Sequence, residues 1–445
     1  MAYTNGDIKR LGNRIVESKG AIGNEDLEIL QEYRKSFTQP LTRTFSDLTQ
    51  LKNRINRTGI IAFRLKRIKT IINKVIREPK MNLDRMGDIA GIRLILGSEQ
   101  QIYKVLDLIQ ANFELSGRIR DYIKNPKDIG YKGIHIYIKD ADFNKRIEVQ
   151  LRTTEFHNWS TLVEITDLLY HTRLKELGYE NNIELGKFHS LISSDLELTE
   201  EQANHIYKVL EKYNYITKLA GIFRKNNTEV KKQWLQVKPR SRYFLIESSS
   251  EKVPQLTGYT NFDKAEEEYF KKYKKDQEAL VVLTSINKPS FEQISIAYAN
   301  YILSYHNFID DIESIIKELS IEALELKRLG RFRKIFKIYE ELQANSILYV
   351  FTSVEEIFIN RTENDKLIIS SPNRISSKKQ MLLKKDVKTA YKKQRISHRI
   401  FINEIYKLAD KRSIQGFLCR IFLKKHSKRL KKRLKALSVE FETNK

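Results

Sequence analysis

Two short segments of this chain alternate apolar and polar residues with a period of two. The first is "GIHIYIKD" (133–140) and the second is "RIEVQLRT" (146–153), in which Ile147, Val149 and Leu151 all point to one side. This period is typical of a β-strand and does not fit a helix. The chain must therefore build a sheet with one apolar face and one polar face.

Apolar residues at helical spacing surround these segments. A further strand is predicted over 90–96, and helices are predicted over 24–39, 41–55, 62–78, 98–113 and 154–177. Strands interleaved with helices predict an α+β fold, a mixed sheet flanked by helices, as the first domain.

The rest of the chain divides into three predicted parts. Residues 200–290 predict a small α+β module, with strands in "RYFLIES" and "ALVVLTSI" and a helix over 262–275. Residues 291–370 are predicted to be mostly helical, apart from a strand in "SILYVFTS". The Ser- and Pro-containing segment 370–379 is the best linker candidate, and a basic helical tail follows at 378–445.

The tail supplies most of the net positive charge. The whole chain has 81 Lys and Arg against 56 Asp and Glu, whereas residues 378–435 alone have 21 against 3. Apolar residues recur there at helical spacing, which predicts amphipathic helices: Ile400, Ile405, Leu408, Leu418, Ile421 and Phe422. Such helices suit a solvated face around a helical core, a nucleic-acid surface, or a membrane-surface or partner helix.

Composition excludes several protein classes. No stretch of about 18 apolar residues occurs, and the first residues lack the apolar core of a signal peptide, so we expect a cytoplasmic protein with no transmembrane segment. The single cysteine, Cys419, excludes an internal disulfide framework and a multi-cysteine zinc site, and we expect it to be buried.

The polar face of the predicted sheet carries chemically useful groups. Alternation places Glu148, Gln150 and Arg152 on that face, and Arg93 on the strand 90–96, with Asp88 just before it. The simplest reading is a solvated sheet face. The convergence of two carboxylates and several cations also suits Mg²⁺ and a polyphosphate substrate.

The predicted helix before the sheet adds ordered cations. Its apolar stripe leaves a polar side that includes Lys66 and Lys74, two turns apart, and Arg64 lies near the helix start. These groups can reach a chain of phosphates, although a merely solvated face fits this segment equally well. Further along, the turn "PKDIGYKG" delivers Tyr131 to the start of the strand at 133–140.

Four motifs in this order resemble the synthetase domain of the RelA/SpoT family over roughly residues 25–195. They are "RLKRIKTIINK", "DIAGIRLI", "RIRDYIKNPKDIGYKGIH" and "IEVQLRT", the last followed by "HNW" and Glu164. The resemblance implies a nucleotidyltransferase-like synthetase fold and a Mg²⁺-dependent pyrophosphokinase. Such an enzyme moves the β,γ-diphosphate of ATP to a ribose 3′-hydroxyl and releases AMP.

The resemblance also implies roles for individual residues. Asp88 and Glu148 would be the catalytic and metal-binding carboxylates. Arg64, Lys66, Lys74 and Arg93 would bind ATP. Tyr131 would stack on the acceptor base, and the remaining acceptor-binding residues would be Arg118, Arg120, Lys127, His135, Gln150 and Arg152.

The sequence departs from the family pattern in the Tyr loop, where Ile129 replaces the usual Asn and Gly133 the usual Ser. No His-Asp dipeptide occurs, so the hydrolase half of the family is expected to be absent. Three functions stay open at this point. They are synthesis of guanosine tetra- or pentaphosphate from ATP and GDP or GTP, transfer of diphosphate to the 3′ end of tRNA, and non-catalytic binding of nucleotide or RNA.

Overall fold

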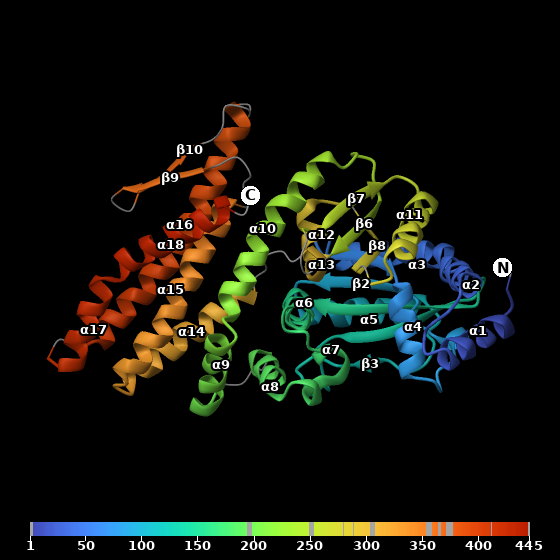
Figure 1. Cartoon of the computed structure of the whole chain (residues 1–445), viewed down its shortest axis with the longest axis horizontal. Coiled ribbons are helices and arrows are strands. Elements are labelled where there is room, and N and C mark those ends of the chain that lie inside the picture. Colours follow the sequence, from blue (N-terminus) through green and yellow to red (C-terminus); the bar gives the residue numbers. More distant parts are fainter. Residues whose placement is uncertain are drawn as a thin grey trace. The chain divides into compact units, whose positions relative to one another are not determined.

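The protein comprises two compact units in a computed structural model (Figure 1). The first unit is Met1–Asn181 with Glu229–Ile302, and the second is Asn182–Thr228 with Leu303–Lys445. The structure describes residues 3–193, 198–248, 253–278, 280–287, 289–302, 308–352, 358–363, 366–370, 377–410 and 412–443. The predicted linker 370–379 lies largely outside these residues.

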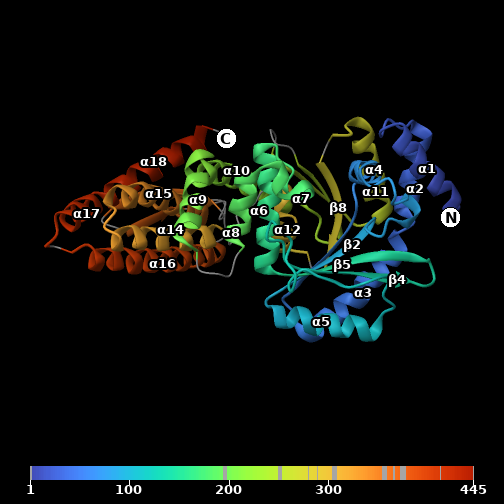
Figure 2. The ribbon, with the colours of Figure 1, turned by 90° about the horizontal axis from the view of Figure 1, so that it is seen from below.

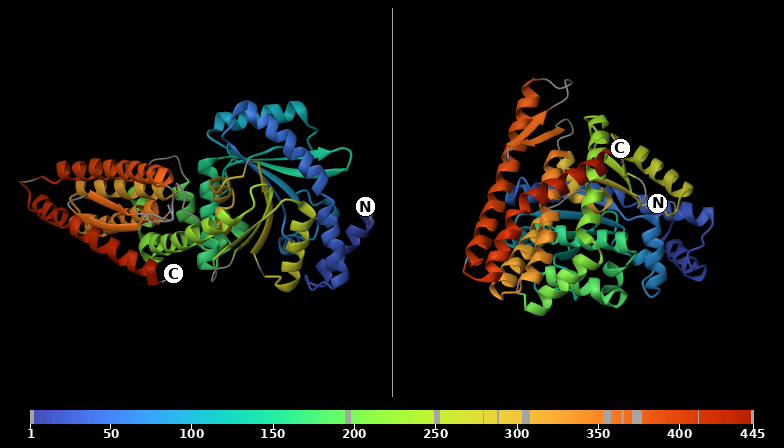
Figure 3. Two further views of the ribbon diagram at one scale, coloured as in Figure 1. Left: turned by 90° about the horizontal axis from the view of Figure 1, so that it is seen from above. Right: turned by 60° about the vertical axis from the view of Figure 1, so that its left-hand side comes forward.

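The first unit is built on an eight-stranded mixed sheet of order β3-β4-β5-β2-β1-β8-β6-β7, which confirms the predicted α+β class. Its strands twist progressively across the sheet (Figure 3). The pairing of β2 with β5 is parallel and the other pairings of the sheet are antiparallel. The strands are β1 (Ile60–Leu65), β2 (Ala90–Leu96), β3 (Arg120–Asp121), β4 (Ile134–Asp140), β5 (Lys145–Thr153), β6 (Tyr243–Ser248), β7 (Gln255–Tyr259) and β8 (Leu280–Ile286).

Helices cover the apolar face of this sheet, with α3 and α5 beneath the central strands (Figure 2). The helical elements of the first unit are α1 (Asn5–Glu17), α2 (Asn24–Lys35), α3 (Thr38–Ile55), α4 (Ile68–Arg77), η1 (Leu83–Arg85), α5 (Glu99–Asn112), α6 (Thr154–Tyr170), α7 (Leu174–Leu177), η2 (Gly178–Asn181), α11 (Phe262–Lys275), α12 (Phe291–Ala297) and α13 (Ala299–Ile302).

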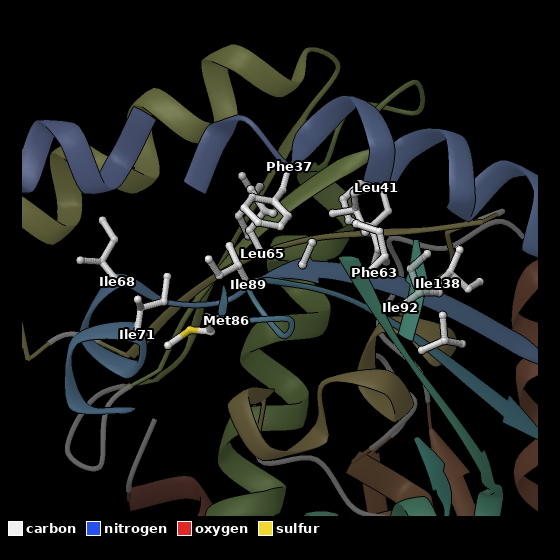
Figure 4. Packing of buried hydrophobic residues seen from close by; sticks show 14 of the residues in the cluster. Phe37, Leu41, Phe63, Leu65, Ile68, Ile71, Met86, Ile89, Ile92 and Ile138 are labelled. Atoms are coloured by element: carbon white, nitrogen blue, oxygen red, sulfur yellow. The ribbon is translucent and has the colours of Figure 1, made fainter. Parts of the chain in front are cut away.

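The main hydrophobic core lies between the apolar sheet face and the helices α1 to α5 and α11. Phe63 and Leu65 from β1 meet Phe37 and Leu41 at the start of α3, and Ile92 from β2 lies nearby (Figure 4). A second cluster on the opposite face packs β1, β8 and β6 against α10 and α12. The part of that face formed by β2, β4 and β5 is left for polar groups.

The helix predicted over 62–78 is wrong in its first part. Residues 60–65 form strand β1, and helix α4 begins only at Ile68. The reason is tertiary, because Ile61, Phe63 and Leu65 alternate into the core while β1 pairs with both β2 and β8. Arg64 is therefore a strand residue, and Lys66 lies in the turn before α4.

Strands β6, β7 and β8 extend the same sheet. These segments were predicted to belong to a small α+β module of their own, together with the helix α11. In the structure β8 pairs with β1, so the chain returns to the first unit after α10 (Tyr215–Gln236) to complete it. Residues near 300 thereby reach the polar side of the sheet.

The second unit is mostly helical, with α14, α15, α16 and α18 side by side (Figures 2 and 3). The strand predicted at 346–353 is wrong, because residues up to Thr352 belong to helix α15. Its elements, besides the first part of α10, are α8 (Ile183–Ile192), α9 (Glu200–Lys212), α14 (Phe308–Glu325), α15 (Leu329–Thr352), β9 (Phe358–Glu363), β10 (Lys366–Ser370), α16 (Ser377–Leu408), α17 (Ile414–Lys424) and α18 (His426–Thr443).

The predicted amphipathic helices of the tail are present, but the buried face differs in part from the predicted one. Ile405 and Cys419 are buried as expected, and Phe401 is buried instead of Ile400. Four residues of the predicted apolar stripe are exposed: Ile400, Leu408, Leu418 and Ile421. Packing against α15 determines which face of the helix is buried. The apolar spacing of the sequence alone was compatible with burial of either Ile400 or Phe401. No helix in the described part of the chain is long and apolar enough to cross a membrane.

A buried ion pair joins helix α2 to α11 across more than 200 residues. Arg34 and Glu266 are 0% and 1% exposed, and Gln31 also donates to the Glu266 carboxylate. Arg34 Nε donates to the carbonyl of Lys66 at 2.7 Å, and its guanidinium lies 4.1 Å from the ring centre of Tyr269. The pair therefore holds the N-terminal helices, α11 and the turn before α4 together.

We predict that Glu266→Ala lowers the free energy of unfolding by about 3–5 kcal/mol, because it leaves the Arg34 charge buried without its partner. Denaturant unfolding of the full chain measures this. Glu28→Ala is the matched control, since it removes an exposed ion pair with Lys274 between the same two helices and should change stability by less than about 1 kcal/mol. Equal effects of the two variants would contradict the prediction.

Candidate active site

A pocket of about 1180 Å³ lies over the polar face of the sheet in the first unit. Its floor comes from β1, β2, β4 and β5, and its walls come from α4, α6, the turn around residues 172–177 and the segment 298–301. Charged and polar side chains dominate the lining next to the sheet. The pocket therefore suits a charged ligand of nucleotide size better than an apolar one.

Strand register decides which side chains share this floor. Gly91 lies opposite Glu148, and Arg93 opposite Gln150, across the parallel β2–β5 pair. On the other side of β5, Gln150 lies opposite His135 of β4. Because residues directly opposite each other point to the same face, these groups form rows across the floor.

Asp88 lies at the entry to β2 between two lysines. Its Oδ2 accepts from Lys66 Nζ at 2.6 Å and from Lys74 Nζ at 2.8 Å. Burial favours a raised pKa for Asp88, but the two ammonium groups outweigh it, so the pKa lies below its ordinary value. Its Oδ1 atom is buried and accepts no hydrogen bond from any residue that the structure describes. One oxygen of an ionised carboxylate is thus left for a further cation.

A hydrogen-bonded chain leads from Tyr131 to the second carboxylate. Tyr131 Oη lies 2.5 Å from His135 Nε2, and His135 Nδ1 lies 3.2 Å from Glu148 Oε1. Burial lowers the pKa of His135, so a neutral imidazole accepts from Tyr131 and donates to Glu148. Burial opposes ionisation of Glu148, but the hydrogen bond from His135 and the charge of Lys66 lower its pKa to about 2. Glu148 is therefore ionised at neutral pH.

Backbone hydrogen bonds fix the loop that carries Tyr131. Lys127 N donates to the carbonyl of Tyr131 at 3.2 Å, and Gly130 N donates to that of Lys127 at 2.7 Å. Gly130 has a φ of +91°, which favours glycine, and a Cβ on Gly133 would lie 3.2 Å from the Leu151 carbonyl oxygen. The two glycines therefore let the loop turn tightly against β5.

Cations surround the ring of Tyr131. The guanidinium of Arg152 lies 5.1 Å from its centre and Lys127 Nζ lies 5.4 Å away. Arg152 Nη2 also donates to Gln150 Oε1 at 3.1 Å, and Gln150 Nε2 donates to Glu148 Oε2 at 3.0 Å. The Tyr131 ring is thus coupled to the carboxylate through both His135 and Gln150.

The pocket brings together most of the residues predicted from the sequence. Arg118 and Arg120 are exceptions, because both are exposed and neither belongs to the described lining. Arg120 instead lies 6.0 Å from the ring centre of Tyr137. The lining includes Arg64, Lys66, Lys74, Asp88, Arg93, Lys127, Tyr131, His135, Glu148, Gln150 and Arg152.

One wall of the pocket was not predicted from the sequence. Arg93 Nη1 donates to the carbonyl of Ala297 at 3.2 Å, and Tyr298 and Tyr301 are buried beside it. Burial and the neighbouring cations of Arg152 and Arg64 lower the pKa of Arg93 to about 10. Two tyrosines three residues apart were the available sequence signal. They lie more than 200 residues from Arg93, so only the fold shows the contact.

Glu164 was named in a motif but given no role. Its carboxylate binds Lys175 and the side-chain amide of Asn300. Burial opposes ionisation of Glu164, but the charges of Lys175 and Arg93 lower its pKa to about 2. Glu164 therefore links α6 to the segment that follows α12.

The donor set fits a hard divalent cation. Mg²⁺ usually takes one or two carboxylates together with phosphate oxygens and water. Asp88 has a buried oxygen that accepts no hydrogen bond from the described residues. Glu148 is ionised, and it lies close enough to Asp88 to affect the pKa of Asp88. No cluster of three or more metal-binding side chains occurs among the described residues.

Most residues of this site lie in a region that is similar to known proteins. Residues 63–174 match the family model described as "Region found in RelA / SpoT proteins". A probable GTP diphosphokinase of rice chloroplasts (RSH3) is 29% identical over 137 residues, or 28% of this chain and 19% of that protein. The GTP pyrophosphokinase YwaC of Bacillus subtilis is 30% identical over 111 residues, or 22% of this chain and 53% of that protein.

Among solved structures, small alarmone synthetase 1 of Bacillus subtilis bound to its product pppGpp covers 37% of this chain and 90% of its own, with 20% identity and a TM-score of 0.32. The chain thus spans about a fifth to a half of the length of the two curated relatives. The matched region carries strands β2, β4 and β5 and both carboxylates. Residues 63–174 of this chain form a RelA/SpoT synthetase domain.

Proposed function

We propose that this chain is an ATP-dependent pyrophosphokinase that transfers diphosphate from ATP to the ribose 3′-hydroxyl of GDP or GTP, making guanosine tetra- or pentaphosphate. The observation that carries the proposal is the convergence of two ionised carboxylates, Asp88 and Glu148, with cations and a Tyr platform in one pocket. Phosphoryl transfer depends mainly on positioning and on charge stabilisation, and this lining can supply both.

On the ATP side, Lys66 and Lys74 hold the phosphates. Both ammonium groups already converge on Asp88, so a polyphosphate can bind them with little rearrangement. Arg64 and Arg93 bind the adenine end, where Arg93 now contacts Ala297. When bound at Asp88 and Glu148, Mg²⁺ would neutralise charge on the transferred phosphates.

On the acceptor side, Tyr131 stacks on the base and Lys127 binds acceptor phosphate. His135 fixes Glu148, and Gln150 and Arg152 hold its second oxygen in place. Glu148 lies at the meeting point of the two sides, so it can orient the attacking hydroxyl as well as the metal. Roles for Arg118 and Arg120 stay predictions, since they lie outside the described lining.

A second candidate is transfer of diphosphate to the 3′ end of tRNA. The observation that favours it is the second unit, where lysines and arginines of α16, α17, α18 and the turns between them are exposed. These include Lys392, Arg399, Lys407, Arg412, Lys424, Lys425, Lys428, Lys431 and Lys432. Such a surface can neutralise the backbone phosphates of RNA.

We predict that Asp88→Asn and Glu148→Gln each lower the rate of AMP release by about 10²–10³-fold or more, because charge stabilisation of the transition state is lost. Purified chain with ATP, Mg²⁺ and GDP is assayed for AMP. Asp142→Asn, an exposed residue that pairs with Arg43, is the control and should keep full activity. Wild-type turnover in either pocket variant would leave the pocket as a binding site without this chemistry.

We predict that Tyr131→Ala raises the KM for the guanine nucleotide roughly 5- to 150-fold, since a stacked base contributes about 1–3 kcal/mol. The KM for ATP should change little. Tyr131→Phe keeps the ring and removes the hydrogen bond to His135, so it separates stacking from positioning of Glu148. Equal losses for ATP and acceptor in the Ala variant would indicate a structural tyrosine.

We predict that the triple substitution of Lys428, Lys431 and Lys432 by Gln weakens tRNA binding and reduces its salt dependence. Each lost phosphate contact lowers the slope of log affinity against log salt by roughly 0.7–0.9. Substitution is preferred to deletion because α18 packs against α15. The reaction on free GDP or GTP should be unchanged.

The matched control removes three exposed lysines from α11 in the first unit: Lys264, Lys271 and Lys275. If the control weakens tRNA binding as much as the α18 variant, the effect is general charge and the second unit has no specific role. If neither variant changes binding or its salt slope, the tRNA candidate loses its support.

A further inference from the structure

Five side chains of the second unit form one continuous chain of polar contacts that the proposed reaction does not use. Tyr339 Oη lies 2.7 Å from His398 Nδ1, and His398 Nε2 lies 3.3 Å from His426 Nε2. His426 Nδ1 lies 2.8 Å from Glu340 Oε1, which also accepts from Arg429 Nε at 2.8 Å. The contacts join α15, α16 and α18, which lie side by side (Figure 1).

The unusual feature is that two imidazoles face each other through their Nε2 atoms. Each of them is oriented through its other ring nitrogen, by a phenol in one case and a carboxylate in the other. Metal-binding histidines are typically held in this way, because the outer partner fixes both tautomer and ring direction. Aromatic packing adds to the restraint, with the ring of Phe336 5.0 Å from that of His426 and that of Phe401 4.7 Å from that of Tyr339.

We propose that His398 and His426 form a two-histidine site for a transition-metal divalent cation of the zinc, nickel or copper class. Bonds of about 2.0–2.1 Å at tetrahedral angles place two ligand nitrogens about 3.3–3.4 Å apart, close to the observed 3.3 Å. Borderline-soft cations prefer imidazole, whereas Mg²⁺ prefers oxygen. No third metal-binding side chain joins the pair among the described residues, so water completes the coordination.

Binding of the cation between His398 and His426 requires no net loss of protons from these hydrogen-bonded side chains. Without metal, Tyr339 donates to His398 Nδ1, His398 Nε2–H donates to His426 Nε2, and His426 Nδ1–H donates to Glu340. On binding, the proton of His398 moves from Nε2 to Nδ1 and is donated to the Tyr339 oxygen. Both Nε2 lone pairs then face the cation, both imidazoles stay neutral, and no proton has to leave.

The surroundings favour the neutral form that a metal requires. Burial is the main reason that the pKa of His398 is lowered to about 4, so its imidazole is neutral at pH 7. His426 is 5% exposed while His398 is half-buried, which leaves an approach from the His398 side. Because the two ligands come from α16 and α18, the cation would cross-link the helices that flank α15.

The test is titration of the full chain, freed of metal with a chelator, with Zn²⁺ by calorimetry and with Co²⁺ by visible absorption. We expect one site, the intense d–d absorption of tetrahedral Co²⁺, and a rise in melting temperature with Zn²⁺ because ligand binding stabilises the folded state. His398→Gln and His426→Gln should each weaken binding by more than tenfold and abolish the tetrahedral spectrum. Tyr339→Phe should weaken it about 10- to 100-fold.

Two controls separate this site from others. His205→Gln changes another histidine of the same unit, whose Nε2 contacts the Glu184 carbonyl, and should leave binding unchanged. The double variant Asp88→Asn, Glu148→Gln should also keep the Co²⁺ spectrum, and excess Mg²⁺ should not displace the cation. Far-ultraviolet circular dichroism checks that each variant stays helical. Wild-type chain that binds no Zn²⁺, or His398 and His426 variants that bind it as the wild type does, would overturn the proposal.

Discussion

The parallel pairing of β2 with β5 is the constraint on which the rest of the site depends. It sets Gly91 beside Glu148 and Arg93 beside Gln150, so one sheet face gathers charge while the other packs into the core. A shift of one residue would exchange the two faces and bury the charges. The large apolar cluster beneath β1, β2, β4 and β5 therefore specifies the position of the polar groups as well as the stability of the sheet.

Burial and the neighbouring cations together determine the ionisation of the two carboxylates in the pocket. Asp88 and Glu148 stay ionised although each loses solvent, because Lys66, Lys74 and the hydrogen bond from His135 compensate for the lost hydration. Charges held at fixed positions in a low dielectric act on a polyphosphate more strongly than mobile charges in water do. The same balance explains why both lysines pair with Asp88.

The pocket is completed by residues from outside the RelA/SpoT region. Strand β8 returns the chain to β1, and the segment after α12 brings Tyr298, Asn300 and Tyr301 to the pocket wall. Through Asn300 this segment contacts Glu164, and through the Ala297 carbonyl it contacts Arg93. The adenine end of the proposed ATP site is thus shaped by a part of the chain that the matched region 63–174 does not include.

The sequence by itself determined the strands with clear alternation, the helical character of the tail and the polar face that holds Glu148, Gln150 and Arg152. Those features are local, because the period of side chains along one segment fixes which of them share a face. The sequence did not determine that residues 60–65 form a strand, that α15 continues through 346–352, or that Ile400 is exposed. In each of these cases a neighbouring strand or helix supplied the deciding contact. The Arg93–Ala297 contact and the facing pair His398 and His426 join segments far apart in the chain, and only tertiary packing brings such groups within hydrogen-bonding distance.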